Sequence, residues 1–97
     1  MKQRYILELY TRPTCSDCQD AKKYLQENEI PYIDKDVGKN SSLEKELITL
    51  SGTRIVPSFA FYKKGFLGSK KLVKNIIGFE MNKQEITTYV NEKLKTF

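Results

Sequence analysis

The sequence predicts one α/β domain over residues 1–97, with elements in the order β-α-β-α-β-β-α and a four-stranded mixed sheet that has helices on both faces. The 97 residues, 39% hydrophobic and 30% charged, suit a single core. In the first half, strand-like segments alternate with segments of helical periodicity, which favours parallel strands. In the second half, two strand-like segments follow each other across a short loop, which favours an antiparallel pair.

The first strand is expected at residues 5–10 and the first helix at residues 15–28. The strand segment is apolar on both faces except at Glu8, as in a central strand covered from both sides. The helical segment has an amphipathic stripe at three- and four-residue spacing, made by Cys18, Ala21 and Leu25. Pro31 is expected to end this helix.

A second strand at residues 32–37 and a second helix follow. The strand segment is more polar than the first. Ser41 and Glu44, three residues apart, form the pattern of a capping box, which predicts the start of the helix. The helix is expected to run through Leu50, with Gly52 as its C-terminal cap.

The second half is expected to form a β-hairpin and a final helix. The strands fall at residues 57–62 and 72–77, on either side of a glycine-containing loop. Asn82 and Glu85 form a second capping-box pattern at the start of the helix. The buried face of this helix is expected to contain Ile86, Tyr89, Val90 and Leu94.

The formal net charge is +5, and much of the basic excess lies in the hairpin. Its lysines are Lys63, Lys64, Lys70, Lys71 and Lys74. They fit a solvated sheet edge that is protected against aggregation, or a docking surface for an acidic protein partner. Because no motif of interleaved basic and aromatic residues accompanies them, we expect no nucleic-acid partner.

Several classes of protein are excluded by the absence of histidine and the presence of two cysteines, Cys15 and Cys18. A Ser-His-Asp triad is impossible, and two cysteines are too few for a disulfide-stapled fold or a closed zinc site within one chain. The N-terminus lacks the features of a signal peptide, and no segment approaches the roughly 20 apolar residues that cross a bilayer. We expect a cytoplasmic monomer with no membrane partner, tightly bound cofactor or metal.

The two cysteines lie where the first strand gives way to the first helix, in the segment Cys15-Ser16-Asp17-Cys18. The backbone N–H groups and the dipole of a helix start favour a thiolate there. Cys15 is therefore expected to attack a disulfide, and Cys18 to resolve the mixed disulfide. A permanent bridge is less favourable, since so short a ring gains only about 2 kcal/mol. A metal site shared with a second chain or a small thiol is a further alternative.

Two charges flank Cys15 and act in opposite directions. Arg12 lies three residues before it and favours the thiolate, whereas Asp17 lies two residues after it and opposes the thiolate. Each exposed charge near a helix end contributes about 0.3–1 kcal/mol. We therefore expect a lowered pKa of Cys15, set mainly by the helix start.

With these features the chain resembles the glutaredoxins of the thioredoxin superfamily. The similarity rests on the active-site segment at residues 10–18 (YTRPTCSDC), on Ile55-Val56-Pro57 before the third strand, and on Gly78 after the fourth. It implies a thioredoxin/glutaredoxin fold and reduction of disulfides in proteins or small molecules. The electron donor it implies is glutathione or a reductant of the thioredoxin-reductase type.

The same resemblance assigns substrate-binding roles to four residues. Arg12 would contact a carboxylate of glutathione or a similar partner. Pro57 would follow a cis peptide bond and face the cysteine pair, while the backbone of Val56 would pair with bound substrate as an added strand. Gly78 would line the same groove. A simple strand-entry proline and a solubilising surface arginine are the structural alternatives.

Glu8 has no role in this scheme. We expect it to face outward or to lie at a solvated edge; the alternative is a buried acid with a raised pKa that passes protons to the thiols.

Two functions therefore follow from the sequence. The first is a dithiol oxidoreductase that uses Cys15 and Cys18. The second is a redox-sensing binding protein, in which the same cysteine pair controls contact with an acidic partner through the lysine-rich hairpin.

Overall fold

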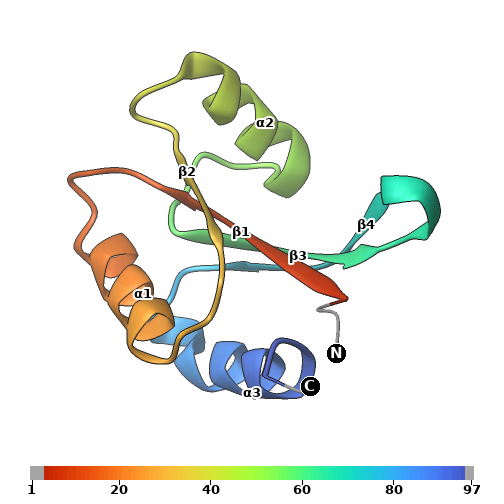
Figure 1. Cartoon of the computed structure of the whole chain (residues 1–97). Coiled ribbons are helices and arrows are strands. Elements are labelled where there is room, and N and C mark those ends of the chain that lie inside the picture. The colour runs from red at the N-terminus through yellow and green to blue at the C-terminus, as the bar shows by residue number, and fades with distance from the viewer. Residues whose placement is uncertain (1–3, 96–97) are drawn as a thin grey trace.

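Strand β1 (Tyr5–Thr11) lies inside a four-stranded mixed sheet in the computed structural model, which describes residues 4–95 (Figure 1). The strand order is β2-β1-β3-β4, where β2 spans Ile33–Asp36, β3 spans Ser58–Lys64 and β4 spans Lys70–Ile77. β1 pairs with β2 in parallel and with β3 in antiparallel orientation, and β3 pairs with β4 in antiparallel orientation. The predicted fold class is confirmed.

Helices cover both faces of the sheet, as predicted (Figure 1). Helices α1 (Ser16–Glu27) and α3 (Lys83–Lys93) lie on one face, and α2 (Ser41–Ser51) lies on the other. The core beneath α1 and α3 includes Leu7, Leu9, Leu25, Phe59, Phe61 and Ile86. The smaller core beneath α2 is formed by Tyr10, Val37, Leu47 and Ala60. Because successive side chains of a strand point to opposite faces, β1 and β3 contribute to both cores.

Helix α1 ends before Pro31, so the expectation that this proline stops it is wrong. Glu29 adopts a left-handed conformation with φ 56°. The N–H of Ile30 then donates to the carbonyl of Leu25 at 2.8 Å, as in a Schellman motif, and Ile30 packs in the core with Leu25. The helix is therefore ended by its own backbone at the left-handed residue Glu29, two residues before Pro31.

The N-cap of helix α2 lies one residue earlier than predicted. Asn40 is the N-cap, and its side-chain oxygen accepts the N–H of Ser42 at 2.8 Å. Ser41 is the first helical residue, so its capping box with Glu44 does not form. Asparagine caps as well as serine, and the sequence offers both side by side. Gly52 is the C-cap, as predicted, and has a left-handed conformation.

Helix α3 begins after a short 3₁₀ turn, η2 (Glu80–Asn82). Asn82 is at the N-cap position but makes no side-chain cap hydrogen bond, so its predicted capping box with Glu85 is absent. Its amide instead donates to the carbonyl of Ile77 at 2.6 Å and closes the chain reversal after β4. Of the predicted face, Ile86, Val90 and Leu94 are buried, and Tyr89 packs at the edge of the same core.

The hairpin strands are longer than predicted at the end that faces the connecting turn. β3 reaches Lys64 and β4 already begins at Lys70, with the 3₁₀ turn η1 (Phe66–Gly68) between them. The extra pairs are Lys63 with Lys71 and Lys64 with Lys70. Backbone pairing therefore continues past the apolar residues from which the strand boundaries were predicted.

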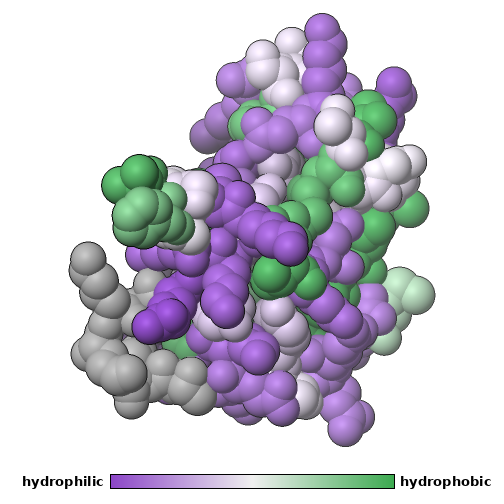
Figure 2. All heavy atoms as spheres, turned by 90° about the vertical axis from the view of Figure 1, so that its right-hand side faces the viewer, coloured by the Kyte–Doolittle hydropathy of each residue, from purple (hydrophilic) through white to green (hydrophobic). Residues whose placement is uncertain are grey.

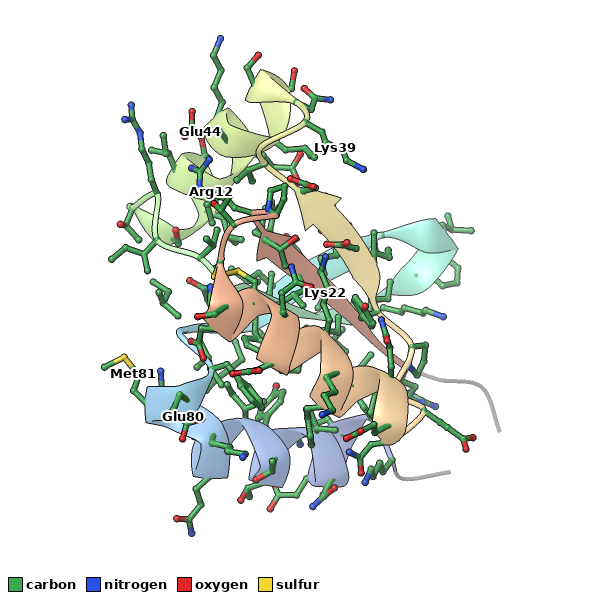
Figure 3. All side chains as sticks on the ribbon, turned by 90° about the vertical axis from the view of Figure 1, so that its left-hand side faces the viewer. Arg12, Lys22, Lys39, Glu44, Glu80 and Met81 are labelled. Atoms are coloured by element: carbon green, nitrogen blue, oxygen red, sulfur yellow. A yellow bond between two sulfur atoms is a disulfide. The ribbon has the colours of Figure 1, made fainter. Side chains whose placement is uncertain are left out.

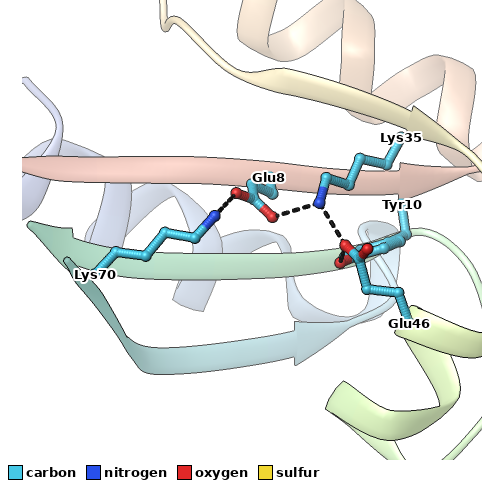
Figure 4. Close-up of polar contacts among 5 residues, drawn as sticks. All are labelled: Glu8, Tyr10, Lys35, Glu46 and Lys70. Carbon is cyan, nitrogen blue, oxygen red and sulfur yellow. Dashed lines mark hydrogen bonds and ion pairs between the residues drawn. The ribbon is translucent and has the colours of Figure 1, made fainter. Parts of the chain in front are cut away.

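Glu8 is 2% exposed, so the expectation that it faces outward is wrong. Its carboxylate lies between two lysines of other strands (Figure 4). Oε2 accepts a hydrogen bond from Lys70, while Oε1 lies 2.9 Å from Nζ of Lys35, an ion pair without hydrogen-bond alignment. Lys35 also contacts Glu46 of α2, which accepts a hydrogen bond from the hydroxyl of Tyr10. This network links β2, β4 and α2 to β1.

Burial by itself would raise the pKa of Glu8, but the hydrogen bond from Lys70 and the positive charges of Lys70 and Lys35 outweigh it. The pKa of Glu8 therefore lies below its ordinary value of 4.5. The alternative of a buried acid with a raised pKa is wrong as well. Glu8 is a structural anion.

Glu8→Gln should lower the free energy of unfolding by about 1–3 kcal/mol at neutral pH, because two lysines lose their shared carboxylate. The loss is smaller than for a fully buried pair, since the side chains of Lys35 and Lys70 are 20% and 42% exposed and can turn to water. The stability from Glu8 is complete above its unfolded pKa and is lost as pH falls through the lower folded pKa. Urea unfolding between about pH 7 and pH 3 measures both effects.

Glu85→Gln is the matched control, since it removes a carboxylate whose ion pair with Lys74 is exposed, and little change is expected. Equal acid sensitivity of the wild-type protein and Glu8→Gln would contradict the assigned role of Glu8.

Candidate active site

Cys15 and Cys18 form a disulfide at the junction of β1 and α1, with their Cα atoms 5.2 Å apart (Figure 3). Cys15 is the N-cap of α1, and its Sγ accepts the N–H of Cys18 at 3.0 Å. Cys15 is partly exposed, whereas Cys18 is completely buried. The two cysteines therefore differ in access to solvent, and the more accessible one caps the helix.

The position of Cys15 favours its ionised form. An N-cap side chain lies at the positive end of the helix dipole and accepts a backbone N–H that otherwise has no partner. Sulfur in this position is a better acceptor as a thiolate than as a thiol. The order of attack expected from the sequence, in which Cys15 acts first, stays a prediction.

The peptide bond between Val56 and Pro57 is cis. It brings the carbonyl oxygen of Val56 to 3.9 Å from Sγ of Cys15, and Pro57 itself is buried. The carbonyl of Pro57 accepts the N–H of Gly78 at 2.8 Å. Gly78 has φ 92°, a left-handed conformation that favours glycine. The structure thus brings Cys15, Val56, Pro57 and Gly78 together from three distant parts of the chain.

The side chain of Arg12 is directed toward α2. Its guanidinium lies 2.8 Å from a carboxylate oxygen of Glu44, and Figure 3 shows the two side chains facing each other. This pairing holds the pKa of Glu44 below its usual range. The backbone of Arg12 is tied to the site, since its carbonyl accepts the N–H of Cys15 at 3.2 Å. The guanidinium of Arg12, which was expected to bind a carboxylate of the substrate, is therefore already paired with the carboxylate of Glu44.

Asp17 makes a contact that sequence reasoning missed. Its carboxylate accepts the N–H of Phe79 at 2.8 Å and the N–H of Glu80 at 3.1 Å. These donors lie 62 and 63 residues away in the chain, so no local pattern could have revealed them. The bonds fasten the first turn of α1 to the turn after Gly78. They also direct the negative charge of Asp17 toward two backbone N–H dipoles, so that this charge disfavours a thiolate at Cys15 less strongly.

Within residues 4–95, no group of three or more Cys, Asp or Glu side chains is arranged to hold a metal ion. None of the helices in this part of the chain is both long and apolar enough to cross a membrane.

The glutaredoxin family model matches residues 7–62, which is more than half of the chain. Among curated relatives, the global transcriptional regulator Spx 2 of Bacillus anthracis is 44% identical over 42 residues, which cover 43% of this chain and 32% of that protein. The chain thus spans about a third of the length of this relative.

Two solved structures show the similarity of fold. A thioredoxin of Trichomonas vaginalis superposes with a TM-score of 0.70 at 19% identity, over 92% of this chain and 78% of that one. A buckwheat glutaredoxin in complex with glutathione superposes with a TM-score of 0.62 at 19% identity, over 92% of this chain and 76% of that one. These structures show the shared fold, and the family match over more than half of the chain shows that the chain belongs to the glutaredoxin family.

Proposed function

We propose that the chain is a thiol–disulfide oxidoreductase that reduces disulfides in proteins or small molecules. The observation that carries this proposal is the asymmetry of the cysteine pair. Cys15 caps the helix through its Sγ and is partly exposed, whereas Cys18 is buried. An incoming disulfide can reach Cys15 from solvent but cannot reach Cys18. Cys15 is thus the attacking thiolate and Cys18 the resolving thiol.

The reaction proceeds by two exchanges. The Cys15 thiolate attacks one sulfur of the substrate disulfide and forms a mixed disulfide, and the other substrate sulfur leaves as a thiolate that takes a proton. Cys18, once deprotonated, attacks Sγ of Cys15, closes the Cys15–Cys18 disulfide and releases the second substrate thiolate, which also takes a proton. Two electrons and two protons pass to the substrate, and a dithiol or two thiols must return them.

Val56, Pro57 and Gly78 supply the surface on which the substrate is held. The carbonyl of Val56 lies close to Sγ of Cys15 at the exposed end of the site. A substrate segment in extended conformation would pair with this backbone as an added strand. This arrangement suits a disulfide within a polypeptide.

A reductant of the thioredoxin-reductase type is the better candidate for the electron donor, with glutathione as the alternative. The pairing of Arg12 with Glu44 supports this preference, because a carboxylate of glutathione would have to compete with Glu44 for the guanidinium. A reducing compartment such as the cytoplasm would keep the pair in its active dithiol form.

A redox-sensing regulator is the second candidate. It is favoured by the curated relatives, which are named as Spx global transcriptional regulators and share up to 42 aligned residues with this chain. In such a protein the Cys15–Cys18 disulfide would change the affinity for a partner protein and would not turn over.

Cysteine variants distinguish these two functions. With insulin or a small mixed disulfide and a supplied reductant, the wild-type protein should turn over many times, and Cys15→Ser should lose this activity because it lacks the attacking sulfur. Cys18→Ser should form a mixed disulfide that can be trapped on Cys15 and identified by mass spectrometry. Negligible turnover by the wild-type protein, together with redox-dependent binding to a partner, would favour the regulator.

Thiol titration tests the order of attack. In the reduced protein, Cys15 should have the lower pKa of the two cysteines, and Asp17→Asn should lower it further by less than about 0.5 unit, because two backbone N–H groups already engage the carboxylate. Asp20→Asn, on the exposed surface of α1, is the matched control. A more acidic Cys18 would refute the assignment of roles.

Recycling assays test the role of Glu44. Glu44→Gln should free Arg12 and lower the KM for glutathione-dependent recycling about threefold, because an exposed pair competes only weakly. Recycling by thioredoxin reductase should not change. Efficient recycling of the wild-type protein by glutathione, unaffected by Glu44→Gln, would show that the ion pair does not limit access to Arg12.

A further inference from the structure

The turn of the β3–β4 hairpin presents two large apolar side chains to solvent. Phe66 is 83% exposed and Leu67 is 87% exposed. Both belong to η1, and Figure 1 shows that this hairpin extends beyond the rest of the sheet. Figure 2 shows hydrophobic side chains projecting at one edge of this side of the molecule, separated by hydrophilic side chains from a second hydrophobic area that reaches its middle. An adjacent exposed Phe-Leu pair at a protruding turn is unusual for a surface that contacts only water.

The turn holds these side chains outward through its backbone. Leu67 has φ 58° and ψ 40°, a left-handed conformation that a branched apolar residue rarely adopts. The turn is closed by the N–H of Gly65, which donates to the carbonyl of Ser69 at 2.7 Å, and by the hydroxyl of Ser69, which donates to the carbonyl of Phe66 at 2.9 Å. Strained backbone of this kind is characteristic of binding sites.

A collar of lysines surrounds the base of the turn. Lys63 pairs across the strands with Lys71, and Lys64 pairs with Lys70, an arrangement of like charges that disfavours the hairpin. Residues 58–79 contain five lysines and no Asp or Glu. Glu8 neutralises Lys70, but Lys63, Lys64 and Lys71 form no ion pair with any residue in the range 4–95. The collar that is free to bind an anionic surface therefore consists of Lys63, Lys64 and Lys71.

The collar lies on both faces of the ribbon. Because neighbouring pairs in a ladder point to opposite faces, Lys63 and Lys71 project to one side and Lys64 projects to the other, where Lys70 is held by Glu8. The apolar turn extends beyond both pairs. The apolar side chains thus lie at the tip of the hairpin and the lysines lie just behind it. This arrangement matches an anionic lipid surface, in which charged phosphates cover an apolar interior. An acidic groove on a protein would engage one face of the hairpin.

We propose that Phe66 and Leu67, with the collar of Lys63, Lys64 and Lys71, form a peripheral contact with an anionic lipid surface. The sequence led us to expect no membrane partner because no segment could span a bilayer. A peripheral contact needs no such segment, so this proposal replaces that expectation. It lies at the opposite end of the sheet from the cysteines, since Lys63 pairs with Tyr5 at the start of β1 and Cys15 follows the end of β1. The disulfide site stays accessible when the hairpin is bound.

Vesicle binding tests the proposal with a built-in reporter. The chain has no tryptophan, so Phe66→Trp introduces a single fluorophore at the turn. Its emission should shift to the blue with vesicles of phosphatidylcholine that contain about 30% phosphatidylserine, and not with phosphatidylcholine alone. Raising the salt from about 0.05 M to about 0.5 M should weaken binding at least tenfold. Equal binding to both kinds of vesicle, or no shift with either, would overturn the proposal.

Matched variants separate the turn from a general effect of net charge. In vesicle sedimentation, the Phe66→Ser, Leu67→Ser double variant should bind at least tenfold more weakly than the wild-type protein, and so should a triple variant with Gln at Lys63, Lys64 and Lys71. A triple variant with Gln at the exposed lysines Lys23, Lys39 and Lys45 removes the same charge elsewhere and should bind as the wild-type protein does. Equal loss in both triple variants would overturn the proposal. Circular dichroism checks that each variant is folded.

Two further outcomes would assign the hairpin to another partner. Binding to polyglutamate that exceeds binding to anionic vesicles, and that depends on Phe66 and Leu67, would indicate an acidic protein. Self-association in sedimentation velocity that the Phe66→Ser, Leu67→Ser variant abolishes would indicate a second copy of the chain. Either result would overturn the lipid contact and leave the oxidoreductase proposal intact, since that proposal is tested by turnover at Cys15.

Discussion

The burial of β1 on both faces is the constraint on which the rest of this structure depends. Leu7 and Leu9 enter the core beneath α1 and α3, and Tyr10 enters the core beneath α2. A strand held in this way leaves the chain little freedom where it ends, so the start of α1 and the sulfur that caps it have a fixed position. The pairing of Tyr10 with Ser58 then places Pro57 next to that end. The active site is thus assembled by strand register rather than by flexible loops.

The same constraint explains the charged network beside the site. A strand covered from both sides cannot expose Glu8, and a buried carboxylate needs opposite charges to remain ionised. Lys35 and Lys70 supply them from strands on either side of β1. Lys70 has a second neighbour, the ring of Tyr62, over which its ammonium lies at 4.5 Å. One lysine of the hairpin is therefore structural, and its neighbours remain available for contacts outside the molecule.

The sequence predicts most features that depend on local spacing. The order of the elements, the stripe of α1, the cap at Gly52 and the cysteine pair at a helix start all follow from residues a few positions apart, and the structure agrees. The cis bond before Pro57 follows only from the family resemblance, because isolated X–Pro bonds are mostly trans. The surroundings of Glu8 and Asp17 could not be predicted, since their partners come from elements far along the chain whose register the sequence does not show.

The burial of Cys18 also bears on the choice between enzyme and regulator. A mixed disulfide on Cys15 would lie beside a thiol held within the same turn, with the two Cα atoms 5.2 Å apart. Intramolecular reactions held at such short range proceed as though the attacking group were far more concentrated than any thiol in solution. Resolution by Cys18 would therefore outpace attack by an external thiol. A site of this kind would release its substrate and return to the disulfide, which is the behaviour expected of the proposed oxidoreductase. In a regulator with the same cysteine pair, a partner would have to distinguish the dithiol form from the disulfide form at the exposed surface around Cys15 and Val56.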